Sequence, residues 1–303
     1  LSSDLKCHIK TLWRAATGSW EIDMHEAQQV DDRDWSLLSL GERIRQIELE
    51  GYLVLPNLLS APEVVRLQAE VAELETTPVD YSEHQRGCSS IQFHGGAITR
   101  LIAHPPTLAF LRELFGQDLI FMTYGYARSE PGHPGISLHT DGQPYGSEIF
   151  GYEGSCPWTV RVLYYLDDLT PDVSPFRVVP RSHLCMHADA NPYQRFSAHP
   201  DEVMVTLKAG SAVLLNHKVF HGNYPNTGTR SRGMLAISYR PAWAGPVQPV
   251  DEWSSTELQQ LPTEVRELFQ SPNHRQGDFF GANKPANMPS VAPGMNVNRW
   301  ERG

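Results

Sequence analysis

Apolar residues recur every three or four positions in the first third of the chain, which is the spacing of a helix with one buried face. The first such run stops at Gly51, a residue suited to end a helix, and a short apolar run follows it. A capping box that opens at Ser60, with proline in the first turn, starts the next run. The pattern predicts a helix with Leu37, Leu40, Ile44 and Ile47 on one face, a strand over Tyr52–Leu55, a helix after Ser60, and a helix over Pro106–Phe115 closed by Gly116.

After Leu119 the pattern changes to short runs rich in β-branched and aromatic residues, separated by Gly, Pro, Asn and Asp. Several short strands at this spacing favour a sandwich or barrel over an alternating β-α-β sheet. No glycine-rich phosphate loop is present, so a nucleotide cofactor has no support in the sequence. The predicted strands cover Leu119–Arg128, Trp158–Leu166, Phe176–Val179, Val203–Leu207, Ala212–Asn216 and Arg232–Tyr239.

The two ends of the chain differ from this central part. Residues 1–35 show no sustained period and are interpreted as an N-terminal extension, which leaves residues 36–243 as a mainly β domain with N-terminal helices. Residues 244–303 are rich in Pro, Asn and Gly, with one helical pattern around Leu258 to Phe269. Because aromatic residues such as Trp300 are unusual in a purely disordered tail, we expect this C-terminal extension to pack on the same domain.

Composition narrows the class of partner. Hydrophobic residues make up 40% and charged residues 20% of the chain, as in ordinary globular proteins. A net charge of -10 disfavours nucleic acid and anionic membrane surfaces, so a small-molecule substrate is expected. The four cysteines form no CxxC pair, and no apolar run reaches membrane-spanning length, so we expect a cytoplasmic protein. The sequence does not determine the number of subunits.

Candidate metal ligands begin with the stretch SLHTDG. His139 and Asp141 stand two positions apart, so both could point the same way from the end of a strand, although such a pair alone is weak support for a metal site. A second histidine, His221, follows an apolar run and precedes Gly222. His217, four positions earlier, is a competing candidate that lies closer to the apolar run. Five further histidines are interpreted as surface or loop residues: His94, His104, His133, His187 and His199.

Two histidines and one carboxylate on one face of a metal leave the opposite positions open, which is the arrangement of non-haem Fe(II) oxygenases. Eleven positions after His221, Arg232 opens a predicted strand, and its planar fork could grip the far carboxylate of a dicarboxylate cosubstrate. Three other classes stay open on these residues: a cupin-like isomerase or lyase that does not use 2-oxoglutarate, a zinc hydrolase, and a binding protein without catalysis.

Over roughly residues 40 to 242 the chain resembles the phytanoyl-CoA dioxygenase family of Fe(II)- and 2-oxoglutarate-dependent oxygenases. The resemblance implies a double-stranded β-helix (jelly roll), with O2 as second cosubstrate. It implies iron ligands His139, Asp141 and His221, and Arg232 on the far carboxylate of 2-oxoglutarate. It also implies a cosubstrate contact at Tyr124, on the strand before the HxD motif, where a relative has glutamine. The stretches that carry it are GYLVLPNLLSAPEVVRLQAEV, LHTDG, VLYYLDDLTPDVSPFRVVPRSH and KAGSAVLLNHKVFHGNYPNTGTRSRGMLAISYRP.

The resemblance also implies a reaction: oxidation of a C–H bond, with release of succinate and CO2. Related halogenases have a small residue where this chain has Asp141, so the carboxylate favours hydroxylation or a related oxidation. The chain departs from the family at Phe176, preceded by Ser174-Pro175, in a stretch where glycine is more frequent, and we expect an altered turn there but unaltered chemistry. The substrate is expected to be a small molecule or secondary metabolite, with Arg128, Trp158 and Arg161 as candidate contacts.

Overall fold

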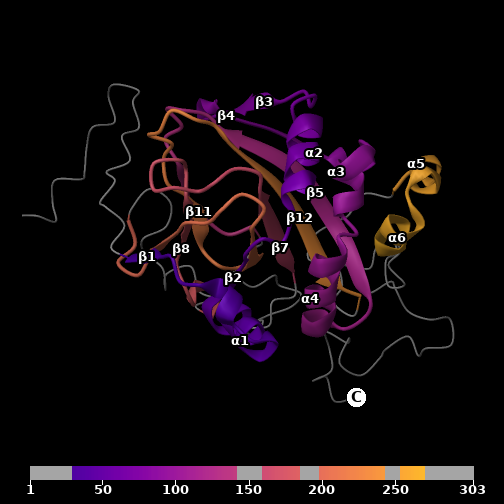
Figure 1. The fold of residues 1–303 in the computed structure, drawn as a ribbon, viewed down its shortest axis with the longest axis horizontal. Helices are drawn as coiled ribbons and strands as arrows, with labels where there is room; N and C mark the ends of the chain where they lie inside the picture. The colour runs from indigo at the N-terminus through magenta and orange to yellow at the C-terminus, as the bar shows by residue number, and fades with distance from the viewer. Residues whose placement is uncertain (1–28, 142–158, 185–197, 243–252, 270–303) are drawn as a thin grey trace, which may run out of the picture.

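The structure is a computed structural model, and it describes residues 29–141, 159–184, 198–242 and 253–269. Two sheets form its body, one of five strands and one of seven, and they share a core of buried apolar residues (Figure 1). The predicted mainly β jelly roll with flanking helices is therefore confirmed. In spatial order the smaller sheet contains β1 (Gln29–Asp31), β9 (Val203–Val205), β8 (Phe176–Val178), β11 (His221–Asn223) and β6 (Ile136–His139). The larger sheet contains, in spatial order, β2 (Tyr52–Leu55), β10 (Ala212–Asn216), β7 (Val160–Tyr165), β12 (Arg232–Pro241), β5 (Leu119–Ser129), β4 (Ser82–Ser89) and β3 (Thr77–Val79).

Helices cover one face of the larger sheet, on the right of Figure 1. The hydroxyl of Tyr164, on β7, shares a hydrogen bond of 2.7 Å with Thr107 on one of these helices. Because side chains alternate along a strand, Arg161 and Tyr165 on β7 project from the opposite face, toward the smaller sheet. These helices are α2 (Ala61–Val71), α3 (Gly96–Leu101) and α4 (Pro105–Phe115). A further helix, α1 (Leu40–Glu50), lies beside β2 at the bottom of Figure 1, and short 3-10 turns occur at Trp35–Leu37, Ile91–Phe93 and Ser182–Leu184.

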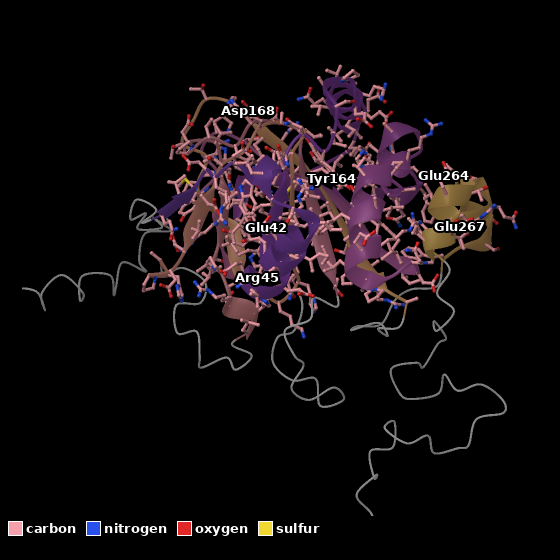
Figure 2. The ribbon with its side chains drawn as sticks, turned by 60° about the horizontal axis from the view of Figure 1, so that its bottom comes forward. Glu42, Arg45, Tyr164, Asp168, Glu264 and Glu267 are labelled. Atoms are coloured by element: carbon pink, nitrogen blue, oxygen red, sulfur yellow. The ribbon has the colours of Figure 1, made fainter. Side chains whose placement is uncertain are left out.

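The predicted signals for the start and end of helices lie at helix ends in the structure. Ser39 and Glu42 form a capping box at the start of α1, and Ser60 and Glu63 form one at the start of α2. Gly51 ends α1 with φ +84°, a conformation that disfavours any other residue, and a side chain there would also meet the ring of His183. In Figure 2, Glu42 and Arg45 mark the solvent-exposed side of α1, whose buried side carries Ile47.

The ends of the described chain pack onto the sheets. The C-terminal helical pattern forms two short helices, α5 (Ser255–Gln260) and α6 (Thr263–Arg266), and a 3-10 turn (Glu267–Phe269), broken at Pro262. Phe269 stacks on Phe121 of β5 with ring centroids 4.5 Å apart, which places this segment against the larger sheet. At the other end, β1 pairs in parallel with β9, so residues that precede position 36 extend the smaller sheet.

Several strands lie outside the predicted set: β1, β3, β4, β6 and β11. Two of them, β6 and β11, are four and three residues long, too short to show the alternation that identifies a strand in a sequence. Their pairing partners, which lie far along the chain, define them instead. No helix in the described ranges is long and apolar enough to cross a membrane.

Candidate metal centre

The pairing of β6 with β11 brings the two predicted histidine ligands together. The strands are antiparallel, and His221 lies directly opposite His139 in the register. Their ring centroids are 4.4 Å apart. Because Gly222 has no side chain, the backbone of β6 can approach β11 closely at this point, where a Cβ would collide with the carbonyl oxygen of Ile136.

Each of these imidazoles is oriented by its own strand. The Nδ1 atom of His139 lies 2.8 Å from the carbonyl oxygen of Ser137, and Nδ1 of His221 lies 3.0 Å from that of Val219. A carbonyl oxygen only accepts, so Nδ1 carries the proton in both rings and Nε2 keeps its lone pair. Metal-binding histidines use this arrangement, in which a backbone acceptor fixes the tautomer and the ring plane.

Asp141 completes the cluster. Its Oδ1 lies 3.8 Å from Nε2 of His139 and its Oδ2 lies 3.6 Å from Nε2 of His221. One ligand atom from each of the three residues lies within 4.8 Å of the others. The backbone N–H of Asp141 donates to the carbonyl oxygen of His217 over 2.9 Å, which anchors the residue after β6 ends. These donors fit a divalent metal held by two imidazoles and one carboxylate.

The electrostatics of the cluster keep His221 and Asp141 in the metal-binding protonation state. Burial lowers the pKa of His221 to about 4, so its imidazole is neutral at neutral pH. Burial by itself would raise the pKa of Asp141, but His221, Arg161 and His139 outweigh it and hold the pKa of that carboxyl below its usual range. The cluster therefore offers a neutral donor and an ionised carboxylate.

Arg232, the predicted cosubstrate ligand, is a completely buried arginine without a carboxylate partner among the described residues. One guanidinium nitrogen donates to the carbonyl oxygen of Ser174 over 3.3 Å, and Nε makes no hydrogen bond to any residue that the structure describes. Asn223, two positions after His221 on β11, donates to the same carbonyl oxygen. Because an unpaired buried charge is costly, this guanidinium fits an anion that binds beside β11.

The turn at Ser174, where the sequence predicts an alteration, has a glycine-like backbone. Ser174 has φ +49°, in the left-handed region that glycine adopts most easily. This turn presents the Ser174 carbonyl oxygen to both Arg232 and Asn223. The departure therefore changes the residue and keeps a glycine-like backbone.

Tyr165 was not predicted as a site residue. Its ring lies 5.4 Å from the guanidinium carbon of Arg232, and its buried hydroxyl makes no hydrogen bond to the described residues. Burial raises the pKa of Tyr165, and the charge of Arg232 opposes that rise. The alternation of β7, which puts Tyr165 on the same face as Arg161, was the available sequence signal.

Of the other residues predicted to contact cosubstrate or substrate, the structure brings only Arg161 to the metal-ligand cluster among those it describes. Tyr124 is not brought to the cluster: its hydroxyl donates to the carbonyl oxygen of Ile98 on α3, over 3.1 Å, on the helix-covered face. Arg128 pairs with Glu130 over 2.6 Å. Trp158 lies outside the described residues. Arg161 does reach the cluster, where its Nη1 donates to Oδ1 of Asp141 over 2.6 Å.

Three other histidines can now be placed. Nδ1 of His217 lies 3.1 Å from the carbonyl oxygen of Thr159, and His217 is not part of the ligand cluster. His104 and His133 are buried, at 7% and 1% exposure, which corrects the expectation of surface or loop positions. Nδ1 of His133 lies 3.3 Å from the hydroxyl of Ser174, whose carbonyl oxygen accepts from Arg232, so this ring packs near Arg232 instead of facing solvent.

A jelly roll that holds two histidines and an aspartate beside a buried unpaired arginine defines the class of non-haem iron oxygenases that use 2-oxoglutarate. Residues 47–234 match the family described as Phytanoyl-CoA dioxygenase (PhyH), and the chain belongs to that family. With its HxD and distal histidine in place, it is a non-haem iron- and 2-oxoglutarate-dependent dioxygenase, with iron and 2-oxoglutarate as its cofactor and cosubstrate.

Known proteins resemble the chain at low identity. It is 23% identical over 242 residues to the L-proline trans-4-hydroxylase of Streptomyces griseoviridis, covering 66% of this chain and 86% of that protein. The solved structure of HygX from Streptomyces hygroscopicus, with nickel and 2-oxoglutarate bound, has a TM-score of 0.56 and 22% identity and covers 66% of this chain and 86% of its own. The alpha-ketoglutarate-dependent epimerase SnoN from nogalamycin biosynthesis has a TM-score of 0.56 and 20% identity, covering 67% and 81%.

Proposed function

We propose that the protein hydroxylates a C–H bond of a small molecule, with O2 and 2-oxoglutarate as cosubstrates and with release of succinate and CO2. The observation that carries the proposal is the position of Arg232, a buried and unpaired cation joined to β11 through the Ser174 carbonyl oxygen that Asn223 shares. A cupin-like enzyme or a zinc hydrolase at the same cluster would have no use for this cation. A dicarboxylate cosubstrate would neutralise it.

In this proposal the chain's own residues position the reactants. Nε2 of His139, Nε2 of His221 and the carboxylate of Asp141 would hold iron(II), which supplies the oxidising chemistry when bound together with 2-oxoglutarate. Arg232 would bind the far carboxylate of 2-oxoglutarate, and the neighbouring hydroxyl of Tyr165 would donate to the same anion. Burial of both groups strengthens these contacts because water does not compete with them.

The kind of oxidation is the finer part of the proposal. A carboxylate at position 141 occupies the place that a halide would need, and the proline hydroxylase relative bears the name of a hydroxylase. The epimerase activity in SnoN's name shows that relatives differ in outcome, so the product must be measured directly. HygX and SnoN have been solved with hygromycin B and nogalamycin RO, which supports a small-molecule substrate here.

A cytoplasmic location belongs to the same proposal, since four scattered cysteines without a CxxC pair fit reduced thiols. A role for Trp158 in substrate binding stays a prediction. The net charge of -10 and the small-molecule ligands of HygX and SnoN support a partner other than nucleic acid or membrane.

The test is an anaerobic titration of metal-free protein with Fe(II) and 2-oxoglutarate, in which the weak visible charge-transfer band of the chelate is followed. We expect the band only when both components are present. A folded protein that binds iron but shows no band with 2-oxoglutarate would contradict the proposal and favour a cupin-like or zinc-dependent activity.

The product is tested separately. Candidate small molecules are screened by substrate-stimulated succinate release, and each hit is repeated with isotopically labelled O2. Label in the oxidised product supports hydroxylation. A product that forms without label, with succinate release intact, would keep the 2-oxoglutarate-dependent class and replace hydroxylation by epimerisation, desaturation or ring closure.

A further inference from the structure

We propose that Arg161 is a positioning residue that acts on the metal through Asp141: it occupies Oδ1 of the carboxylate and leaves Oδ2 as the metal ligand. The inference rests on the proposed metal centre. It replaces the expectation that Arg161 contacts the substrate directly.

The geometry divides the two oxygens of Asp141 between different partners. Oδ1 accepts from Nη1 of Arg161 over 2.6 Å and lies 3.8 Å from Nε2 of His139, whereas Oδ2 lies closer to an imidazole, 3.6 Å from Nε2 of His221. The side chain of Asp141 is 15% exposed and that of Arg161 is 32% exposed, so the pair is partly shielded from water. A charge-assisted hydrogen bond in such a place is stronger than one on an open surface.

Two parts of the fold hold Asp141 from different sides. Its backbone N–H is tied to the carbonyl oxygen of His217, which follows β10, and its carboxylate is tied to Arg161, on β7. His217 is in turn bonded to the carbonyl oxygen of Thr159, two residues before Arg161. The start of β7 therefore fixes both the backbone and the side chain of the third ligand, although it supplies no ligand itself.

The consequence for the metal concerns the number of positions that Asp141 occupies. A carboxylate with both oxygens free can bind a metal through both, and it then takes a position that the cosubstrate or O2 needs. With Oδ1 committed to a guanidinium, binding through Oδ2 alone is favoured. Removing a residue that hydrogen-bonds to a metal ligand without binding the metal itself typically lowers metal affinity or activity by about 10–100-fold.

The experiment compares Arg161→Gln and Arg161→Lys with the wild-type full-length chain. Ni(II), which binds such sites more tightly than Fe(II), is the probe, and affinity is measured by calorimetric titration without substrate. We expect Arg161→Gln to weaken Ni(II) binding by about 10–100-fold. Arg161→Lys should recover part of the loss, because a single nitrogen of the arginine makes the bond to Asp141 and an ammonium group keeps its charge.

Arg128→Gln is the matched control, because Arg128 also makes a 2.6 Å bond to a carboxylate and is similarly exposed, at 37%, but its partner is Glu130. We expect wild-type Ni(II) affinity for this variant. A loss equal to that of Arg161→Gln would show a general effect of surface charge and would overturn the proposal. Thermal unfolding of the metal-free variants identifies any that fail to fold, in which case Arg161→Lys carries the comparison.

A double-mutant cycle separates action through Asp141 from a direct effect. In an Asp141→Ala background the further change Arg161→Gln should leave Ni(II) affinity unchanged within about twofold, because its target is gone. Undiminished Ni(II) affinity of Arg161→Gln in the wild-type background, with weaker substrate binding, would overturn the proposal in favour of a substrate contact. Failure of the wild-type chain to bind Ni(II) at all would instead contradict the proposed metal centre.

Discussion

His139 and His221 face each other across two short paired strands, and each directs Nε2 toward Asp141 because its own Nδ1 is bound to the carbonyl oxygen two residues earlier. The two rings therefore have the same tautomer for the same reason. This repeated local motif, brought into register by the sheet, assembles the proposed metal site from residues that are distant in the sequence.

Replacement of His221 by alanine should abolish the Fe(II)/2-oxoglutarate band and 2-oxoglutarate turnover, because the ligand set loses one of its two imidazoles. The loss of Ni(II) affinity should exceed the roughly 10–100-fold loss that is typical when a residue bonded to a metal ligand is removed. His217→Ala is the control: that ring is bonded to the Thr159 carbonyl oxygen, so the variant should bind metal and show lower thermal stability. If His217→Ala lost Ni(II) binding and His221→Ala kept it, His217 would be the ligand.

Replacement of Arg232 by alanine should leave Ni(II) affinity intact and weaken 2-oxoglutarate binding. A desolvated charged contact of this kind is worth roughly 2–5 kcal/mol, so the dissociation constant should rise about 30-fold or more. The dissociation constant of Arg232→Lys for 2-oxoglutarate should lie between those of wild type and Arg232→Ala, since lysine keeps the charge and loses the planar fork. Wild-type affinity for 2-oxoglutarate in Arg232→Ala would show that the buried cation serves another purpose.

The change Tyr165→Phe removes a buried hydroxyl that makes no hydrogen bond to the described residues within normal bonding distance. We expect unchanged or higher thermal stability, because an unsatisfied buried group is lost. The dissociation constant of 2-oxoglutarate should rise by roughly 10-fold or more, the cost of one hydrogen bond to a charged group. An unchanged constant, measured by titration of the nickel-loaded protein, would place this hydroxyl outside the cosubstrate contact.

The change Gly222→Ala should both destabilise the protein and weaken Ni(II) binding. A Cβ at this position would overlap the carbonyl oxygen of Ile136 and lie 3.0 Å from that of Ser137, so β11 must move away from β6 and separate His221 from His139. Gly41→Ala is the matched control, because nothing lies within 4 Å of its Cβ on α1, and helix propensity predicts a stability gain of up to about 1 kcal/mol. Equal metal affinity in the two variants would contradict the close-approach argument.

The buried histidines should make the metal-free protein sensitive to mild acid. Burial, with Arg232 and His84 adding to it, lowers the pKa of His133 to about 3, whereas an unfolded histidine titrates near about 6.5. Between these values the unfolded state binds more protons, so this residue's contribution to stability is complete above about pH 6.5 and is lost as the pH falls toward 3. Urea denaturation of wild type and His133→Gln should show a shallower pH dependence in the variant, and parallel curves would refute the assignment.

The amino-acid pattern determined the local elements and the chemical groups of this protein. Capping boxes at Ser39 and Ser60 and the glycine at position 51 act within a few residues, so the sequence shows them directly. The HxD pair, the later histidine and the arginine eleven positions after it likewise carry a recognisable spacing. Strands such as β6 and β11 escaped prediction because three or four residues are too few for an alternation to be seen.

Tertiary structure alone decided which of these groups meet. Tyr124 and Arg128 looked as eligible as Arg161 in the sequence, yet Tyr124 faces α3, Arg128 pairs with Glu130, and Arg161 reaches Asp141. The strand face on which a side chain lies and the register of pairing between distant strands make this choice, and both depend on how the whole core packs. The chain encodes its ligands locally, but the partners that orient them are set by contacts between β6, β7, β10 and β11, which no local pattern contains.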